Sequence, residues 1–439
     1  MLPILDLATA AGTQAFEGRL ARLKDGLSLE GEWSATAARV IKDVRERGDA
    51  AVVEQMRRFT DPGFAADRIR VTDAELAAAE GSLTGELSEA IDAAIEHVER
   101  YQRHVLPGDA ETIELGGAEL GLRWTPVPSA GLLVPGGSAV LFSSLIMLAA
   151  PAIVAGVDRE RLAVVTPPPT RRSGDEPTDV SPITLAVARR LGVGGVCRVG
   201  GPAAVAALAY GSESIDPVSF IAGPGHPVVQ AAKLQVQGAV GIDGFYGASE
   251  VAVLADETAD PAKVASDLIA QAEHDPGKCF LVCWRPEVFD AINAEMRKQY
   301  EHRTRREAIR ASLLDDSAGV LCKDEAQAAE VVDRLACEHV TLAVADPDAW
   351  LGRLQHGGEF FLGHETPVAA GDYYAGPSHC LPTGTTARYA SGVSAYTFLK
   401  RSGTVRYRNG MPSRAIAHIA AMARAEGLDG HAASAERRG

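Results

Sequence analysis

The first quarter of the chain carries a helical pattern. Between residues 34 and 104, apolar residues recur at three- and four-residue spacing in "SATAARVIKDVRERGDAAVVEQMRRFT" and in "DAELAAAEGSLTGELSEAIDAAIEHVERYQRHV". This spacing places apolar side chains on one face of an α-helix. Thr72 or Asp73 is suited to cap the second of these helical stretches. The pattern therefore predicts a helical N-terminal arm.

The pattern changes near residue 120 to short apolar runs that alternate with helices. "AGLLVPGG", "RLAVVTPPP" and "PVSFIAGPG" indicate strands, and "ITLAVARRLGV" indicates a helix between them. A second series follows from about residue 245, with the strands "EVAVLADE", "CFLVCW" and "HVTLAVA". Such alternation favours parallel sheets with right-handed crossovers. Glycines cluster after the strands of the first series, and open α/β sheets bind ligands at the carboxyl ends of their strands.

These patterns predict an α/β fold with two tandem, incomplete Rossmann-like parallel-sheet domains, a helical N-terminal arm and a helical C-terminal tail. We expect four regions: the arm with part of the first α/β domain (1–125), the first α/β domain (126–244), the second α/β domain (245–385) and the helical tail (386–439). No G-x-G-x-x-G opens a helix after a strand, so the dinucleotide fingerprint is absent. The chain also has no Walker A loop, H-E-x-x-H or G-x-S-x-G.

Residues 139–157, "AVLFSSLIMLAAPAIVAGV", are apolar over a length that approaches a membrane span. Pro151 and the polar pair Ser143 and Ser144 interrupt the segment, and "VPGG" precedes it like a turn into a helix. We expect a buried helix that packs on a parallel sheet covered on both faces.

Composition narrows the class of protein. The chain has 439 residues, of which 46% are hydrophobic and 23% charged, as in soluble globular proteins with more than one domain. The formal net charge of −15 argues against a nucleic-acid partner. Six cysteines without a CxxC pair, and an N-terminus without a secretion signal, predict a cytoplasmic protein with reduced thiols.

Two pairs of residues are candidates for chemistry. Gln271 and His274, in "QAEH", are three apart and share a face of a predicted helix, so they form either half of a metal site or a polar helix end. Glu338 and His339 are adjacent where a helix runs into an apolar strand. A carboxylate beside an imidazole suits general acid/base catalysis, and the alternative is a charged loop pair.

Two further stretches complete a possible donor set. Asp372 lies in the glycine-rich "AAGDYYAGPSH", where the backbone can approach a ligand, although a turn aspartate is the simpler interpretation. "EGLDGH", near the end, carries Glu426 and His431, and a histidine in an exposed tail usually has no role. Together Gln, His, Asp and His would suit zinc, with open positions for a substrate.

Taken in order, these stretches resemble the histidinol dehydrogenase family. The resemblance runs from "VRERGDAAV" (44–52) to "GLDGH" (427–431) and includes "VPGGSA", "GGPAAVAALAYG", "ASDL..QAEH" and "GDY.AG.SH.LPT". It implies a zinc-dependent enzyme that oxidises L-histidinol to L-histidine with two NAD, by way of an aldehyde. It also implies a homodimer with shared active sites, in which the tail of one chain completes the site of the other.

The resemblance assigns roles residue by residue. It implies four zinc ligands, which are Gln271, His274, Asp372 and His431. It implies that His339 accepts the hydroxyl proton and that Glu338 activates water on the aldehyde. The substrate-binding positions that it implies are Ser249, Glu426, His339 and the four ligands.

The departures from the family gather at the NAD positions. The family's tyrosine, glutamine and asparagine are Leu133, Ala203 and His226 here, and the family's glutamate four residues before the ligand aspartate is Val368. Leu and Ala cannot form the hydrogen bonds of Tyr and Gln. Three hypotheses follow: a zinc dehydrogenase that uses NAD in an altered pocket, a paralogue that oxidises another small hydroxyl substrate, and a zinc hydrolase, lyase or cyclase that has lost NAD.

Overall fold

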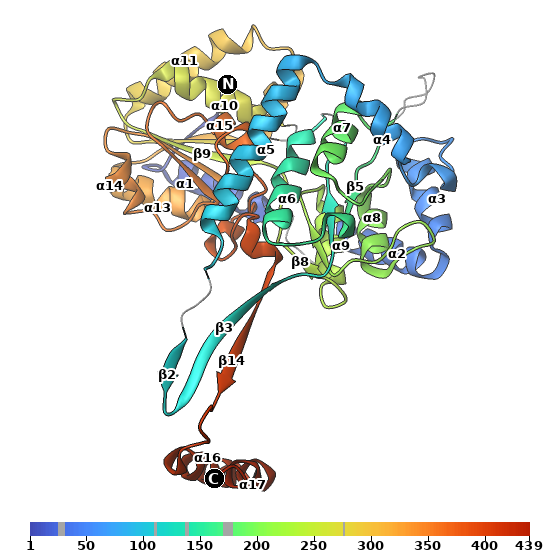
Figure 1. The fold of residues 1–439 in the computed structure, drawn as a ribbon. Coiled ribbons are helices and arrows are strands. Elements are labelled where there is room, and N and C mark those ends of the chain that lie inside the picture. Colours follow the sequence, from blue (N-terminus) through green and yellow to red (C-terminus); the bar gives the residue numbers. More distant parts are fainter. Residues whose placement is uncertain (25–30, 109–111, 137–139, 170–178, 275–276) are drawn as a thin grey trace.

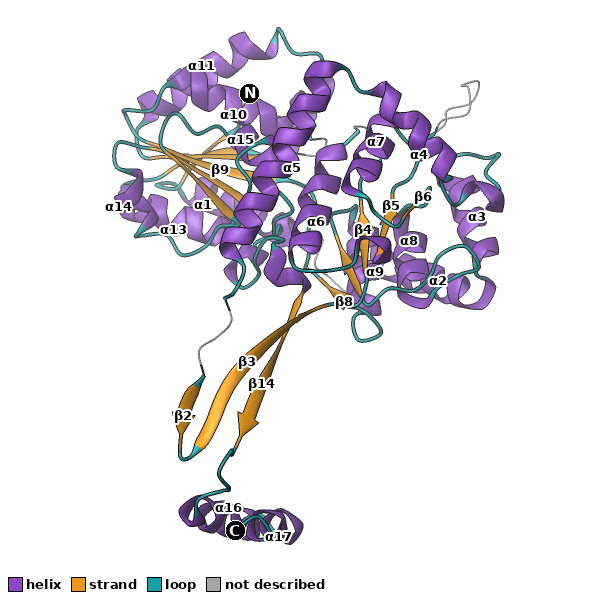
Figure 2. Cartoon of the chain, viewed as in Figure 1, coloured by secondary structure: helices purple, strands orange, loops and turns teal. Residues whose placement is uncertain are grey.

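The computed structural model describes residues 1–24, 31–108, 112–136, 140–169, 179–274 and 277–439. They form a body of two lobes from which a long arm projects (Figure 1). Each lobe contains one parallel sheet with helices on both faces, and the arm contains a three-stranded antiparallel sheet (Figure 2). This arrangement confirms the predicted α/β class with two sheet domains in tandem.

The first domain is built on a parallel sheet with the strand order β6-β5-β4-β7-β8. Its strands are β4 (Ala130–Leu133), β5 (Leu162–Val165), β6 (Gly195–Cys197), β7 (Phe220–Ala222) and β8 (Gly241–Ile242). Its helices are α6 (Phe142–Val154), α7 (Pro182–Leu191), α8 (Gly201–Tyr210) and α9 (Pro227–Val236).

Helix α6 accounts for most of the apolar segment 139–157, of which residue 139 lies outside the described residues. Its side chains from Ser143 to Ala152 are buried, and many belong to the core of the first domain. In the part of the chain that the structure describes, no helix is long and apolar enough to cross a bilayer. The segment is therefore a buried helix, as predicted.

The predicted helical arm lies over the first domain. It consists of α2 (Glu32–Arg47), α3 (Asp49–Phe59), α4 (Asp73–Ala79) and α5 (Gly85–Val105). Thr72 caps α4: its side chain accepts from the Glu75 N–H, and the Glu75 side chain accepts from the Thr72 N–H, as in a capping box. Helix α2 packs on α8 and α9, and α5 packs on α6 (Figure 1).

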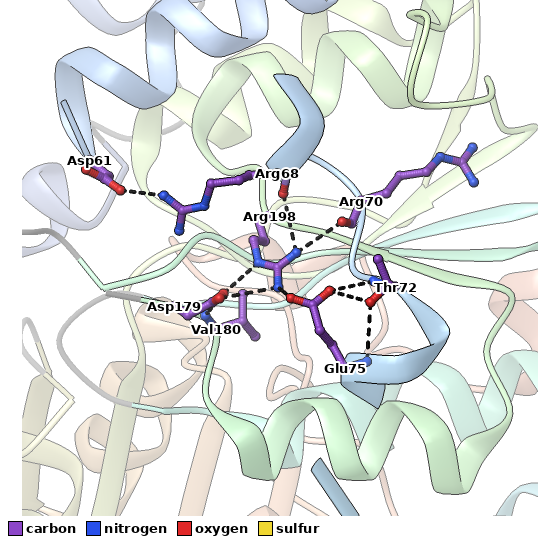
Figure 3. A network of polar contacts seen from close by, with 8 residues as sticks. All are labelled: Asp61, Arg68, Arg70, Thr72, Glu75, Asp179, Val180 and Arg198. Atoms are coloured by element: carbon purple, nitrogen blue, oxygen red, sulfur yellow. Dashed lines mark hydrogen bonds and ion pairs between the residues drawn. The ribbon is translucent and has the colours of Figure 1, made fainter. Parts of the chain in front are cut away.

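A buried arginine joins these N-terminal helices to the first sheet (Figure 3). Arg198, directly after β6, is only 3% exposed. Its guanidinium donates to the carboxylates of Glu75 and Asp179, each at 2.6 Å. It also donates to the backbone carbonyls of Arg68 and Arg70, at 3.4 and 3.1 Å. One side chain thus fixes the segment that leads into α4 against the carboxyl edge of the sheet.

The second domain is built on a parallel sheet with the strand order β1-β11-β10-β9-β12-β13. Its strands are β1 (Ile4–Asp6), β9 (Glu250–Ala255), β10 (Lys278–Cys283), β11 (Ala318–Leu321), β12 (His339–Ala343) and β13 (Glu359–Leu362). Its helices are α1 (Ala10–Lys24), α10 (Pro261–Ala272), α11 (Pro286–Tyr300), α12 (Arg306–Asp315), α13 (Glu325–Leu335), α14 (Pro347–Leu351) and α15 (Val368–Tyr373). Strand β1, which sequence patterns did not predict, extends this sheet by pairing with β11.

The projecting arm combines two distant parts of the chain. Strand β3 (Ala118–Pro126) pairs antiparallel with β2 (Ile113–Leu115) and with β14 (Leu399–Arg406). Helices α16 (Ser413–Ala425) and α17 (Asp429–Glu436) pack on each other at the far end, away from both lobes (Figure 1). The predicted helical tail (386–439) therefore contains a strand before its two helices. The sequence of β14, "LKRSGTVR", is too polar to show a strand pattern.

Candidate functional site

The adjacent pair Glu338 and His339 lies at the amino edge of the second sheet. His339 is the first residue of β12, and Ser249 directly precedes the neighbouring strand β9. Helix α10 ends at the same edge, because it leads back into β10. The predicted strand entrance is confirmed. The site therefore lies at the edge opposite to the one where open α/β sheets usually bind ligands.

Glu338 is held as a buried acceptor. It is 5% exposed, and its Oε1 accepts hydrogen bonds from the Ser249 hydroxyl and, at 2.8 Å, from the Glu250 N–H. Burial raises the pKa of Glu338 well above its usual range, although these two hydrogen bonds oppose the change. A carboxylate in this setting is a stronger base than one in water.

His339 is buried beside this carboxylate without a hydrogen bond of its own. It is 2% exposed, its Nδ1 lies 3.7 Å from Glu338 Oε1, and its ring packs edge-on against Phe361. Within the described residues, neither ring nitrogen has a hydrogen-bond partner. Burial lowers the pKa of His339 to about 3, the neighbouring imidazoles of His274 and His379 add to the effect, and the backbone of Glu250 opposes it. The ring is therefore neutral near pH 7 and has a nitrogen free to accept a proton.

Three of the four predicted zinc ligands lie near this pair. Gln271 Nε2 donates to Ser249 Oγ at 2.7 Å, which leaves Gln271 Oε1 buried and, among the described residues, without a partner. His274 follows in the turn after α10, and Asp372 lies on α15, which packs against α10. Burial lowers the pKa of His274, opposed by Asp372. Burial likewise raises the pKa of Asp372 to about 6, opposed by His274.

Two residues that sequence reasoning missed complete the walls of the site. His379 Nδ1 lies 3.0 Å from the Asp372 carbonyl oxygen, and its Nε2 lies 3.1 Å from the hydroxyl of Ser144 on α6 of the first domain. His379 belongs to the glycine-rich loop that contains Asp372, so its sequence context offered a signal. Glu359, the first residue of β13, is the register partner of His339. A single glutamate at the start of an apolar strand gave no signal in the sequence.

The structure does not bring Glu426 and His431 to this site within one chain. Both are exposed, Glu426 at the end of α16 and His431 on α17 at the far end of the projecting arm (Figure 1). The predicted set of four ligands is therefore divided: Gln271, His274 and Asp372 lie at the second sheet, and His431 lies on the arm.

The donor set at the second sheet suits zinc but is incomplete. No group of three His, Cys, Asp or Glu residues that could hold a metal occurs in the described part of the chain. One imidazole and one carboxylate lie together, however, with the orphaned amide oxygen of Gln271 buried nearby. These are the donor types of a borderline-soft ion, and a fourth donor would have to come from elsewhere.

The three positions that correspond to coenzyme contacts differ in accessibility. Leu133 is 5% exposed and Ala203 is fully buried, and both belong to the apolar core of the first domain. These two residues therefore do not fit a polar coenzyme contact. His226 is exposed at the N-cap of α9, where its Nδ1 accepts from the Val228 N–H and its ring contacts Trp33 edge-on at 4.8 Å between centroids.

A fully buried ion pair supports the loop at the end of β7. Lys233 Nζ lies 2.5 Å from Asp243 Oδ1, and neither side chain is exposed. Lys233 also donates to the carbonyl of Gly223 at 2.8 Å, while Asp243 Oδ2 accepts from the Gly223 N–H at 2.6 Å. Both backbone groups of Gly223 are thus bound by the pair, which fixes the turn before His226.

The family model and the related sequences that match this chain all point to one family. Residues 27–439 match the family model described as "Histidinol dehydrogenase". Histidinol dehydrogenase of Cereibacter sphaeroides is 42% identical over 406 residues, 92% of this chain and 91% of the relative. Histidinol dehydrogenase of Rhizobium meliloti is 41% identical over 402 residues, 91% of each.

Solved structures agree with this result. The crystal structure of histidinol dehydrogenase from Elizabethkingia anophelis has a TM-score of 0.88 and 28% identity, and covers 100% of this chain and 98% of its own. A betaine aldehyde dehydrogenase of Staphylococcus aureus, with a TM-score of 0.51 and 12% identity over 91% of this chain and 87% of its own, shares the fold alone.

Proposed function

Because the chain belongs to the histidinol dehydrogenase family, we propose that it oxidises a small amino alcohol, L-histidinol, to the amino acid through an aldehyde. The observation that carries the proposal is the buried His339, which is neutral, has no hydrogen-bond partner among the described residues and lies beside Glu338. A neutral imidazole with an unpartnered ring nitrogen can take a proton from a bound hydroxyl.

The two residues divide the proton transfers. His339 accepts the hydroxyl proton while the carbinol carbon loses hydride. Glu338, whose Oε1 is fixed by the Ser249 hydroxyl and the Glu250 N–H, takes a proton from the water that adds to the aldehyde. The resulting hydrate again presents a hydroxyl to His339 for the second oxidation. Gln271, His274 and Asp372 would hold zinc, with His431 as the fourth ligand. Zinc would supply a Lewis acid that orients the substrate.

NAD is assigned as the hydride acceptor on the family relation alone, because Leu133 and Ala203 offer no polar contact. A titration with NAD and NADP, on protein with one zinc per chain, tests this assignment. Binding of NAD and a rise in absorbance at 340 nm with L-histidinol would support it. Zinc-loaded protein that binds neither coenzyme would refute the dehydrogenase and favour a hydrolase, lyase or cyclase.

The role of His339 has a matched test. His339→Asn is expected to abolish turnover while zinc content and the melting temperature are retained. His302→Asn is the control, because His302 is exposed in the turn after α11. A His339→Asn enzyme with activity near that of the control would contradict the assignment of His339 as the base.

We further propose a homodimer in which each arm reaches the site of the other chain. Supporting it, the arm exposes large apolar side chains that a soluble surface rarely groups together. They are Ile113, Leu115, Val405 and Met422, each more than 60% exposed. In such a dimer, His431 and Glu426 of one chain would complete the site built around His274 and Asp372 of the other.

Subunit mixing separates this arrangement from a site made by one chain. His431→Ala and His274→Ala proteins are each expected to be inactive, and refolding them together is expected to restore activity, because half of the sites in a mixed dimer would be intact. If mixing restores no activity although mixed dimers form, the shared site is wrong.

A further inference from the structure

Glu359 stands out among the acidic residues of the site because no role has been found for it. It opens β13 and is the register partner of His339 on β12. Register partners on adjacent parallel strands point to the same face of a sheet, and Phe361, two residues further along β13, packs on the His339 ring. The Glu359 carboxylate therefore points to the face that carries the His339 imidazole.

This carboxylate lacks a counter-charge. Its Oε2 is buried and has no hydrogen-bond partner within the described residues. In the same part of the chain, no Lys, Arg or His forms an ion pair with it, and a second negative charge, that of Asp372, acts on it. Gly371 covers it: a side chain at that position would place its Cβ 3.1 Å from Glu359 Oε2.

Burying an unpartnered carboxylate oxygen beside a second, partly exposed carboxylate is costly unless a donor or cation lies near both. The nearby orphaned groups point to a ligand at this place, because His339 and Gln271, each 2% exposed, also have polar atoms without partners. Val368, one helical turn before Asp372 on α15, is buried and cannot supply a second carboxylate. The carboxylate that accompanies Asp372 is therefore that of Glu359 on β13.

We infer that Glu359 is a specificity-determining residue that accepts a hydrogen bond from the amino group of the substrate. The inference rests on the proposed function, in which the substrate is an amino alcohol. Its amino and hydroxyl groups occupy neighbouring carbon atoms. Adjacent strands are about 4.8 Å apart, so a substrate whose hydroxyl meets His339 presents its amino group one strand away, at Glu359.

The test compares two ligands on two proteins. Calorimetry on zinc-loaded protein measures the affinity for L-histidinol and for the analogue that lacks only the amino group, 3-(imidazol-4-yl)propan-1-ol. Glu359→Gln keeps the shape of the side chain but removes its charge. We expect it to weaken L-histidinol binding by about 10- to 100-fold, the range for a hydrogen bond to a charged group. Its affinity for the analogue, its zinc content and its melting temperature should stay unchanged.

Glu365→Gln is the matched control, because Glu365 is 85% exposed six residues further along and pairs with Lys263. If Glu359→Gln loses the same factor in affinity for both ligands, or loses affinity for neither, the inference is overturned. Loss of zinc would also overturn it and make Glu359 a metal ligand. If Glu359→Gln folds poorly, Glu359→Asp, which retracts the charge by one methylene, should weaken L-histidinol selectively.

Experiments on the wild-type protein test the proposed reaction separately from the role of Glu359. Wild-type protein that binds L-histidinol but does not oxidise it would refute the reaction, while the ratio of the two affinities still decides the role of Glu359. Wild-type protein that binds both ligands equally well would refute an amino-group contact at Glu359. Binding of neither ligand would overturn both proposals.

Discussion

The buried ion pair between Lys233 and Asp243 makes a sharp prediction about stability. Replacing Lys233 by Met removes the only charge that the structure places against Asp243, at 2.5 Å and with both side chains fully buried, among the described residues. Breaking a buried pair on one side typically costs about 3–5 kcal/mol, because the remaining charge is left without compensation. The hydrogen bond to the Gly223 carbonyl is lost as well. We therefore expect Lys233→Met to lose about 3–5 kcal/mol of unfolding free energy near pH 7.5.

The double variant Lys233→Met/Asp243→Asn should be more stable than the single one. It removes the orphaned charge but keeps one oxygen that can accept from the Gly223 or Gly244 N–H, so roughly 1–3 kcal/mol of unfolding free energy should be regained.

The deficit in unfolding free energy of Lys233→Met should also depend on pH. Burial raises the pKa of Asp243, and Lys233 opposes the rise. Without the lysine, the folded-state pKa climbs further above the unfolded value, so the variant loses stability as pH rises and its deficit shrinks towards pH 5.

Urea unfolding followed by circular dichroism at pH 5 and pH 7.5 measures these differences. Lys298→Met is the control, because Lys298 is 70% exposed and its pair with Glu295 should contribute about 0–1 kcal/mol. The reasoning would be refuted by a Lys233→Met protein as stable as this control, or by a double variant that is less stable than the single one.

Other predictions address the buried Arg198, the second sheet and the thiols. Arg198→Ala should lower the free energy of unfolding by about 2–4 kcal/mol and lower the melting temperature. Arg47→Ala, which removes exposed ion pairs, should lower the free energy of unfolding by under about 1 kcal/mol. Equal melting temperatures of the two variants would contradict the role of Arg198 in joining the N-terminal helices to the first sheet. Burial raises the pKa of Glu250 to about 7, opposed by Lys278, so its contribution to stability is present below about pH 4.5 and is lost towards pH 7. The free energy of unfolding of Glu250→Gln, measured in urea titrations, should therefore rise relative to that of the wild type between about pH 4.5 and pH 7. A difference between the two proteins that stays constant over this pH range would contradict the prediction. All six cysteines are buried and unpaired, so Ellman's reagent should label almost none in the native protein and six after unfolding; rapid native labelling would be inconsistent with this burial.

Local patterns predicted much of the fold. Because buried parallel strands are nearly continuous apolar segments, the alternating runs located most strands of both sheets, but not β1 or β8. Patterns failed where pairing is distant and side chains are exposed or few. Strand β1 has three residues and pairs with residues 319–321, and β14 is polar and pairs with residues 119–126. Neither pairing leaves a periodic signal in its own segment.

The site shows a similar division between local and distant information. Helical spacing predicted that Gln271 and His274 share a side, and the strand entrance predicted the place of Glu338 and His339. No local pattern shows that Asp372 approaches His274 from another helix, or that Glu359 is the register partner of His339. The burial of Leu133 and Ala203 likewise depends on the packing of the whole first domain.

Strand β1 has a consequence for any attempt to divide the protein. The chain starts in the second sheet, passes through the whole first domain and returns, so residues 4–6 pair with a strand more than 300 residues later. During synthesis, β1 must wait unpaired until β11 has left the ribosome. A fragment cut at the apparent boundary near residue 245 would lack β1 and expose the edge of β11, whose residues Ala318–Val320 are otherwise buried. Open strand edges of this kind are templates for association. Such a fragment is therefore expected to aggregate, and restoring residues 1–24 to it should suppress that aggregation.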